Sequence, residues 1–221
     1  MKNMKNLDLD IKIETIQSLK NESDLADDFM WKDFKISLLQ KHSDGRIEVV
    51  GTMQISECEL AGFEHYMDVF DRRESTSVFS RLFEDPTTLK HQVAKDLFIR
   101  YGTDILLFDT VYVLDHAHIE EEFRGNGLFK LMLEKTLSAL KIDGEECALL
   151  VYAFPLQYSC KDLDVGSEAF KKGCKKLSRF YQELGFLKLL EDEEGTILIH
   201  NTGMHLKAKN TNHKGLTNER F

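Results

Sequence analysis

The sequence has few of the residues that interrupt or cross-link a chain. Only two prolines, Pro86 and Pro155, occur in 221 residues, and glycine and serine form no tracts, so the composition predicts no flexible linker between domains. The four cysteines make no Cys-x-x-Cys pair, which argues against a zinc finger or a redox motif. We expect these cysteines to be reduced and mostly buried.

Long apolar runs and an excess of positive charge are also missing. No stretch approaches the roughly 20 apolar residues of a membrane span, and the opening MKNMKNLDLDIK matches neither a signal peptide nor a myristoylation pattern. Lysine and arginine total 29 against 38 acidic residues, a net charge of −9. We therefore expect a cytoplasmic protein that binds neither nucleic acid nor membranes, since both partners select cationic surfaces.

The composition that is present suits one large fold. Hydrophobic residues make up 42% of the chain and charged residues 30%, which allows a substantial core without disulfide bonds. The sequence predicts a single domain over residues 1–206, followed by a polar, flexible tail over 207–221.

Alternating apolar and polar residues predict strands in the first part of the chain. Residues 7–16 alternate as a half-buried strand. Residues 33–40 and 46–60 form two further strands, joined by KHSDG, whose Asp-Gly pair favours a hairpin turn. Between the first two strands, residues 21–31 have the composition of a short acidic helix.

Helical spacing replaces this alternation over residues 61–103, which are predicted to form a helical insert. Residues 64–70 and 77–83 carry apolar side chains at helical spacing, and Asp85-Pro86 is expected to open a longer helix from Thr88 to Ile99. A long apolar, β-branched strand is predicted next, over residues 104–119.

Two helices alternate with strands in the remainder. The first helix shows a stripe at three-then-four spacing, made of Phe129, Met132, Leu133, Leu137 and Leu140. A buried strand (146–154), an amphipathic helix (167–184) ending at Gly185, and two closing strands (186–190, 196–201) follow. The order predicts an α/β (α+β) fold whose central mixed sheet of about seven strands has helices on both faces.

The stretch HIEEEFRGNGLFKLMLEKTL (118–137) places Arg-Gly-Asn-Gly where a helix should begin. A helix start has unpaired N–H groups and a partial positive charge. Glycines let a phosphate approach these groups, and an arginine adds a charge-assisted bond, so FRGNGL is interpreted as a pyrophosphate cradle. The alternative is a surface turn with a solvated arginine. Rossmann and P-loop patterns do not fit.

In its context this loop resembles the acyl-CoA signature of the GNAT superfamily of N-acetyltransferases, Arg/Gln-x-x-Gly-x-Gly/Ala. Arg124 and Gly127 fill the first two positions, whereas Phe129 stands where the family has Gly or Ala. SRFYQELGF (178–186) is similar to the family's later fYeklGF segment. The resemblance covers about residues 104–201. The helical insert between the third and fourth strands departs from the family, and so does the long connection AFPLQYSCKDLDVG; both are expected to shape the acceptor site.

The resemblance implies acetyl-CoA as cosubstrate, no metal, and a small-molecule or peptide amine as acceptor; a homodimer is compatible with it. Backbone groups of Ala117, His118 and Ile119 would bind pantetheine and the thioester oxygen. The pyrophosphate would be held by the loop and the helix start, namely Arg124, Gly125, Asn126, Gly127, Leu128 and Phe129.

Asp115 and Tyr181 are the candidate catalytic residues. Family members often place the general base along the fourth strand, where a partly desolvated Asp115 would have a raised pKa; a structural hydrogen bond is the alternative. Tyr181 matches the family's general acid toward the thiolate, or else it is a core aromatic residue. His116 and His118 share the other face of the strand, where they could form a proton relay or a metal pair, but without a third ligand a metal is not favoured.

Three hypotheses remain open at the level of sequence. The first is an N-acetyltransferase that transfers the acetyl group directly within a ternary complex. The second is a catalytically inactive acyl-CoA-binding module that regulates or scaffolds a partner. The third is a nucleotide- or phosphate-binding protein without thioester chemistry. A run of lysines at 171–176 is expected to be a solvated helix face, with one of them able to reach the CoA 3′-phosphate.

Overall fold

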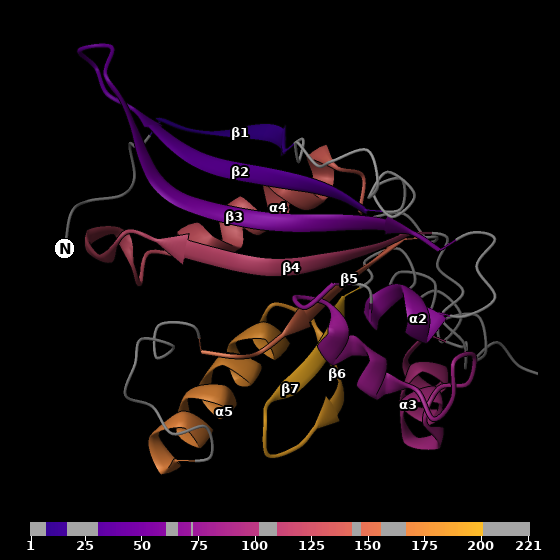
Figure 1. The fold of residues 1–221 in the computed structure, drawn as a ribbon. Coiled ribbons are helices and arrows are strands. Elements are labelled where there is room, and N and C mark those ends of the chain that lie inside the picture. Colours follow the sequence, from indigo (N-terminus) through magenta and orange to yellow (C-terminus); the bar gives the residue numbers. More distant parts are fainter. Residues whose placement is uncertain are drawn as a thin grey trace, which may run out of the picture. The chain divides into compact units, whose positions relative to one another are not determined.

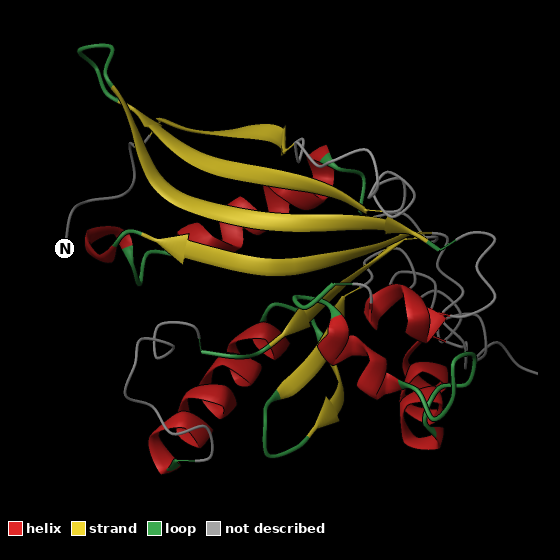
Figure 2. Cartoon of the chain, in the orientation of Figure 1, coloured by secondary structure: helices red, strands yellow, loops and turns green. Residues whose placement is uncertain are grey.

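The computed structural model describes residues 8–16, 31–60, 66–71, 73–101, 110–142, 147–155 and 167–200. It has the predicted α+β class, with a mixed sheet of seven strands and several helices (Figures 1 and 2). The elements group into two compact units. The first contains β1 (Asp8–Ile16), β2 (Trp31–Lys41), β3 (Ile47–Glu59), most of β4 (Thr110–Ile119), the 3-10 helix η4 (Glu121–Phe123) and α4 (Leu128–Ala139). The second contains α2 (Tyr66–Asp71), the 3-10 helix η3 (Ser77–Leu82), α3 (His91–Tyr101), β5 (Cys147–Tyr152), α5 (Glu168–Glu183), β6 (Leu187–Glu191) and β7 (Thr196–His200).

The first unit is built on antiparallel strands in the order β1-β2-β3-β4, and α4 packs against β1. The predicted Asp-Gly hairpin between β2 and β3 is confirmed, because Gly45 has a φ of 83° and its N–H donates to the His42 carbonyl at 2.9 Å. Ile36, Leu38 and Ile55 on the sheet are fully buried, as is Met132 on α4. Their burial supplies the apolar core of this unit.

The second unit places α5 against the antiparallel strands β5-β7-β6. Ser167 caps α5, since its hydroxyl accepts the N–H of Phe170 at 3.2 Å. The predicted helix end is confirmed at Gly185, whose φ of 98° is left-handed, with Phe186 buried directly after it. The central strand β5 is apolar and buried, as expected from its sequence.

The helical insert is present between β3 and β4, but two of its segments differ from prediction. Residues 77–82 form a 3-10 helix, and α3 begins at His91 rather than Thr88. The cause of the late start is Asp85, whose Oδ1 accepts the N–H groups of Thr87 at 3.0 Å and Thr88 at 2.9 Å. This side chain stabilises a turn in place of the first helical turn.

Several predicted segments fall wholly or partly outside the described residues. The acidic helix at 21–31 does so except for Trp31, which opens β2. The predicted strand at 104–119 is confirmed from Thr110 onward, and its earlier residues lie outside the described ranges, as does the tail at 207–221. Among the helices that the structure describes, none has the length and apolar character needed to cross a membrane.

Candidate functional site

A β-bulge and a glycine in β3 fix the end of β4, where the candidate loop begins. The β2–β3 register shifts between Leu38 and Leu39 and skips Val50, whose carbonyl accepts the N–H of Glu120 at 3.1 Å. A Cβ added at Gly51 would lie 2.6 Å from Ile119 Cδ1 and 3.1 Å from the His118 carbonyl oxygen. Glycine therefore allows the backbone of His118 and Ile119 to approach β3 closely.

The loop between β4 and α4 satisfies its own carbonyl groups with its side chains. Phe123 of η4 is 3% exposed and anchors the loop in the core. Arg124 Nε donates to the Ile119 carbonyl at 2.8 Å, and Asn126 Nδ2 donates to the carbonyls of Phe123 and Arg124, both at 3.1 Å. Because these acceptors are already bonded, the loop presents less negative charge to an approaching anion.

Both loop glycines have a conformation that favours glycine. Gly125 and Gly127 have φ angles of 74° and 75°, which are strained for other residues. A Cβ on either would meet no atom within 4 Å, so the space beside them is open. Gly127 is also the N-cap of α4 and supplies no capping side chain. The start of α4 at Leu128 therefore has no side-chain cap.

The buried stripe of α4 differs from the predicted stripe at its first residue. Leu128 is 4% exposed and begins the stripe, which continues through Met132, Leu133 and Leu137. Phe129, predicted on that stripe, is only partly buried. The reason is helix geometry: consecutive residues are turned by about 100°, so a stripe that contains the buried Leu128 is not centred on Phe129. Open space, first-turn amides and Arg124 together fit the pyrophosphate of an acyl-CoA.

Three carboxylates weaken this positive potential. Glu120, Glu121 and Glu122 precede the loop and are all exposed. Of these, Glu120 lies close to His118, with 3.7 Å between Oε2 and Nε2. Arg124 is therefore a cation beside a local excess of negative charge, and that charge opposes the binding of a polyanion.

Asp115 lies on β4 and is partly buried, and its Oδ2 accepts a 2.5 Å hydrogen bond from the hydroxyl of Ser56. Ser56 is 1% exposed and comes from the neighbouring strand β3. The sequence could not identify this partner, because it depends on the register between β3 and β4. On the same strand His116 is exposed and His118 is partly buried. No grouping of three His, Cys, Asp or Glu suited to a metal occurs in the part of the chain that the structure describes.

Tyr181 belongs to the second unit, where it lies on the buried face of α5. Its side chain is 6% exposed, and its ring packs edge-on against Phe186 with centroids 5.2 Å apart. Burial raises the pKa of the Tyr181 hydroxyl well above its ordinary value. Tyr181 is thus a core aromatic residue whose hydroxyl stays protonated at neutral pH, and its predicted part in catalysis stays a prediction.

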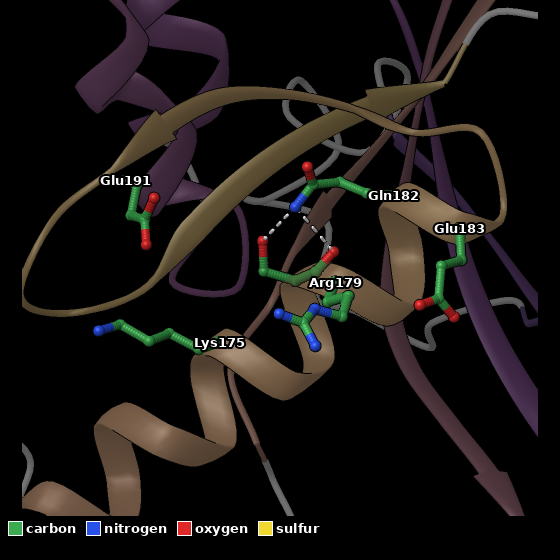
Figure 3. A pocket seen from close by; sticks show the side chains of 6 residues that line it. Lys175, Arg179, Gln182, Glu183 and Glu191 are labelled. Carbon is green, nitrogen blue, oxygen red and sulfur yellow. Dashed lines mark hydrogen bonds between the residues drawn. The ribbon is translucent and has the colours of Figure 1, made fainter.

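A hollow between α5 and β6 is a feature that sequence reasoning missed. It has a volume of about 530 Å³, and Figure 3 shows the side chains of its wall. Gln182 Nε2 donates to the carbonyl and hydroxyl oxygens of Ser178 at 3.3 and 3.1 Å, and so orders one side of the hollow. Lys175 and Arg179 contribute positive charge to the same wall.

Comparison with known proteins gives only distant similarities. No family model matches the chain, and no curated protein matches it. A solved KacTA–DNA complex is similar at 13% identity and a TM-score of 0.41, covering 91% of this chain and 99% of that chain. NAA60 of Arabidopsis thaliana with acetyl-CoA is similar at 10% identity and a TM-score of 0.39, covering 86% and 98%. Arylalkylamine N-acetyltransferase 2 of Aedes aegypti is similar at 17% identity and a TM-score of 0.39, covering 87% and 99%. An acetyltransferase is thus among the proteins to which this chain is distantly similar.

Proposed function

We propose that this protein is an N-acetyltransferase that moves an acetyl group from acetyl-CoA directly to an amine. One observation carries the proposal, namely the loop from Arg124 to Gly127. There, two left-handed glycines lie beside open space at the uncapped start of α4. Such a helix start binds phosphate groups through unpaired amides and the helix dipole. The GNAT-like signature of the same residues supports acyl-CoA as the ligand.

In this proposal the pyrophosphate is held by the amides of Leu128 and Phe129 together with Arg124. Because Arg124 Nε is engaged by the Ile119 carbonyl, its Nη groups are the ones directed to phosphate. Asn126 keeps the loop closed by bonding two of its carbonyls. When acetyl-CoA is bound it supplies the activated acyl group, and residues of the chain bind it, orient it and move the protons.

The end of β4 would hold the acyl portion. Backbone groups of Ala117, His118 and Ile119 would bind pantetheine and polarise the thioester carbonyl. Asp115, oriented by the hydroxyl of Ser56, would accept the proton of the attacking ammonium, directly or through water. Tyr181 would supply a proton to the leaving sulfur. The acceptor in this scheme is a small-molecule or peptide amine.

A second candidate, a catalytically inactive acyl-CoA-binding module, is favoured by the surroundings of the two catalytic candidates. Tyr181 is packed in the core beside Phe186, and Asp115 already accepts a short hydrogen bond from Ser56. Both observations also suit purely structural roles. In that case the loop would bind acyl-CoA and no acetyl group would be transferred.

Two measurements separate these functions. Calorimetry with acetyl-CoA, CoA and ATP is expected to show tight binding of the first two and weak binding of ATP. Release of free thiol from acetyl-CoA, measured with a panel of amines and amino-terminal peptides, is expected to rise with at least one acceptor. Binding without thiol release across the panel would favour the inactive module, and equal affinity for ATP would contradict an acyl-CoA site.

A further inference from the structure

Helix α5 presents a cluster of positive charge in a chain of net charge −9. Five cationic side chains are exposed along it: Lys171, Lys172, Lys175, Lys176 and Arg179. Within the described ranges none of the five forms an ion pair. Five unneutralised cations on one helix of an acidic protein favour a partner of opposite charge.

Three of these cations line a groove. The hollow of about 530 Å³ and a second one of about 330 Å³ both lie between α5 and the β6–β7 hairpin and share Lys175 and Glu191, so they adjoin, and the two together are called the groove. The helix wall carries Lys171, Lys175 and Arg179. Figure 3 shows Lys175 and Glu191 on opposite sides of the groove.

Two of the three hairpin carboxylates that line the groove, Glu191 and Asp192, are already engaged. Glu191 pairs with Lys188 at 2.6 Å. Asp192 pairs with Arg81 through Oδ2, and its Oδ1 accepts the N–H groups of Glu194 at 2.9 Å and Gly195 at 3.2 Å. The charges that remain available to a ligand are those of the three helix cations and of two carboxylates, Glu183 and Glu193, which leaves the groove with a net positive charge.

The spacing of these cations matches an extended chain. Lys171, Lys175 and Arg179 are four residues apart, which places successive side chains about 6 Å apart along the helix. Alternate residues of an extended strand are about 6.6 Å apart and point to the same side. Acidic side chains at every second position of a strand would thus meet the three cations in turn.

We propose that the groove between α5 and the β6–β7 hairpin binds an extended segment of another protein with acidic side chains at alternate positions. A peptide suits it better than a nucleic acid, because a strand turns its intervening neutral side chains toward Glu191 and Glu193. A nucleic acid carries negative charge along its whole length, with one phosphate per strand about every 3.4 Å, and would meet those carboxylates. The inference is independent of acetyl transfer.

The test is calorimetric titration of the full chain with the capped hexapeptide Glu-Thr-Glu-Thr-Glu-Thr. Loss of one exposed ion pair is expected to weaken binding about two- to fivefold. Lys171→Gln/Lys175→Gln/Arg179→Gln should therefore weaken it about eightfold or more. The matched control is Lys172→Gln/Lys176→Gln, which removes lysines from the same helix that do not line the groove. Affinity should also fall between about 0.1 M and about 1 M salt, where the Debye length shrinks from about 10 Å to about 3 Å.

Three comparison ligands make every outcome decisive. The peptide with Gln in place of Glu should not bind. A single-stranded oligothymidylate should bind more weakly than the acidic peptide. Acetyl-CoA should not displace the peptide. Four outcomes would each overturn the proposal. The oligonucleotide could bind more tightly than the peptide and lose this binding in the groove variant, or acetyl-CoA could displace the peptide. The control variant could lose as much affinity as the groove variant, or the peptide could fail to bind.

Discussion

Arg124 has two functions at the residue scale, and substitutions can separate them. Its Nε holds the loop by bonding the Ile119 carbonyl, while its charge is proposed to bind phosphate. Arg124→Ala should weaken acetyl-CoA binding by about 1.5–3 kcal/mol, the range for hydrogen bonds to charged groups. Arg124→Lys retains the charge but loses the planar fork, so its affinity should lie between those of wild type and the alanine variant. Calorimetry measures all three.

The matched control for this prediction is Arg46→Ala. Arg46 is an exposed arginine of the same unit that pairs with Asp44 at 2.6 Å in the β2–β3 turn, and its loss should leave acetyl-CoA affinity unchanged. Wild-type affinity in Arg124→Ala would remove the main support for the phosphate site. Equal losses in the lysine and alanine variants would assign Arg124 to loop structure rather than to charge.

Tyr181 combines burial with a raised pKa, which predicts a specific dependence of stability on pH. The folded state holds the Tyr181 proton more tightly than the unfolded state, whose tyrosine titrates near its ordinary pKa of about 10. Below that pH both states are protonated and stability is unaffected. Above it the unfolded state loses its proton first, so stability falls by up to about 1.4 kcal/mol per pH unit. Tyr181→Phe should remove this component when urea unfolding is followed from neutral to strongly alkaline pH.

The same variant tests catalysis at Tyr181. Since phenylalanine keeps the ring, Tyr181→Phe should cost at most about 1 kcal/mol of stability at neutral pH. If the hydroxyl protonates the leaving thiolate, kcat should fall roughly 100-fold with little change in acetyl-CoA affinity. Wild-type kcat into the alkaline range would restrict Tyr181 to packing. Tyr152→Phe is the control, because burial raises its pKa as well.

At the scale of elements, periodicity predicted the order of strands and helices but not the contacts between distant ones. The hairpin at Gly45 and the helix end at Gly185 were predictable because each depends on local backbone conformation. The Ser56–Asp115 hydrogen bond joins residues 59 positions apart. It requires a strand register that periodicity does not specify. The late start of α3 was missed because the side chain of Asp85 accepts the N–H groups of Thr87 and Thr88, which keeps these residues in a turn.

The insert is tied to the β6–β7 hairpin by one arginine. Arg81 of η3 pairs with Asp192 and, at 3.0 Å, with Glu194, and its side chain is 25% exposed. Tyr152 holds the same turn by donating its hydroxyl to the Glu194 carbonyl at 2.6 Å. Arg81→Met should destabilise the protein by about 1–2 kcal/mol, because the partly buried guanidinium loses its pairs with Asp192 and with the exposed Glu194. It should also speed amide hydrogen exchange in η3 and the turn. Arg46→Ala, whose side chain is 77% exposed, should cost less than about 1 kcal/mol; equal costs would contradict the anchoring role.

Gly51 couples β3 to the end of β4. In Gly51→Ala the new Cβ would meet Ile119 Cδ1 at 2.6 Å and the His118 carbonyl oxygen at 3.1 Å, which should destabilise the protein by about 1–3 kcal/mol. Acetyl-CoA affinity should fall too, because the displaced Ile119 carbonyl anchors Arg124. Adding Ile119→Val removes the Cδ1 atom, so the double variant should recover part of the stability in thermal unfolding. No recovery would mean that the carbonyl contact, rather than the Ile119 side chain, limits the site.

At the scale of the whole molecule, neither compact unit is a continuous stretch of chain. The first unit takes β1 to β3 and then, after the insert, β4 to α4, while the second takes the insert and the elements from β5 onward. Cutting the chain between β3 and α2 would therefore leave the first unit incomplete. Residue composition alone could not predict this division, since it depends on which distant segments pack together. Because each unit is made of two separate stretches of chain, the division is compatible with the proposed single domain over 1–206.

The net charge of −9 predicts an unusual salt dependence for a site that binds an anion. At about 0.01 M salt the Debye length is about 30 Å, so the whole molecule repels acetyl-CoA; at about 0.15 M it is about 8 Å, and only nearby charges act. The association rate measured by stopped flow should therefore rise with salt. Glu122→Gln, beside the loop, should speed association at both salt concentrations. Glu59→Gln also removes one negative charge, but Glu59 lies nine residues along β3 from Val50 and so about 30 Å from the loop. This variant should speed association only at the lower salt concentration. Equal effects of the two variants at about 0.15 M would show that the loop is not where the anion binds.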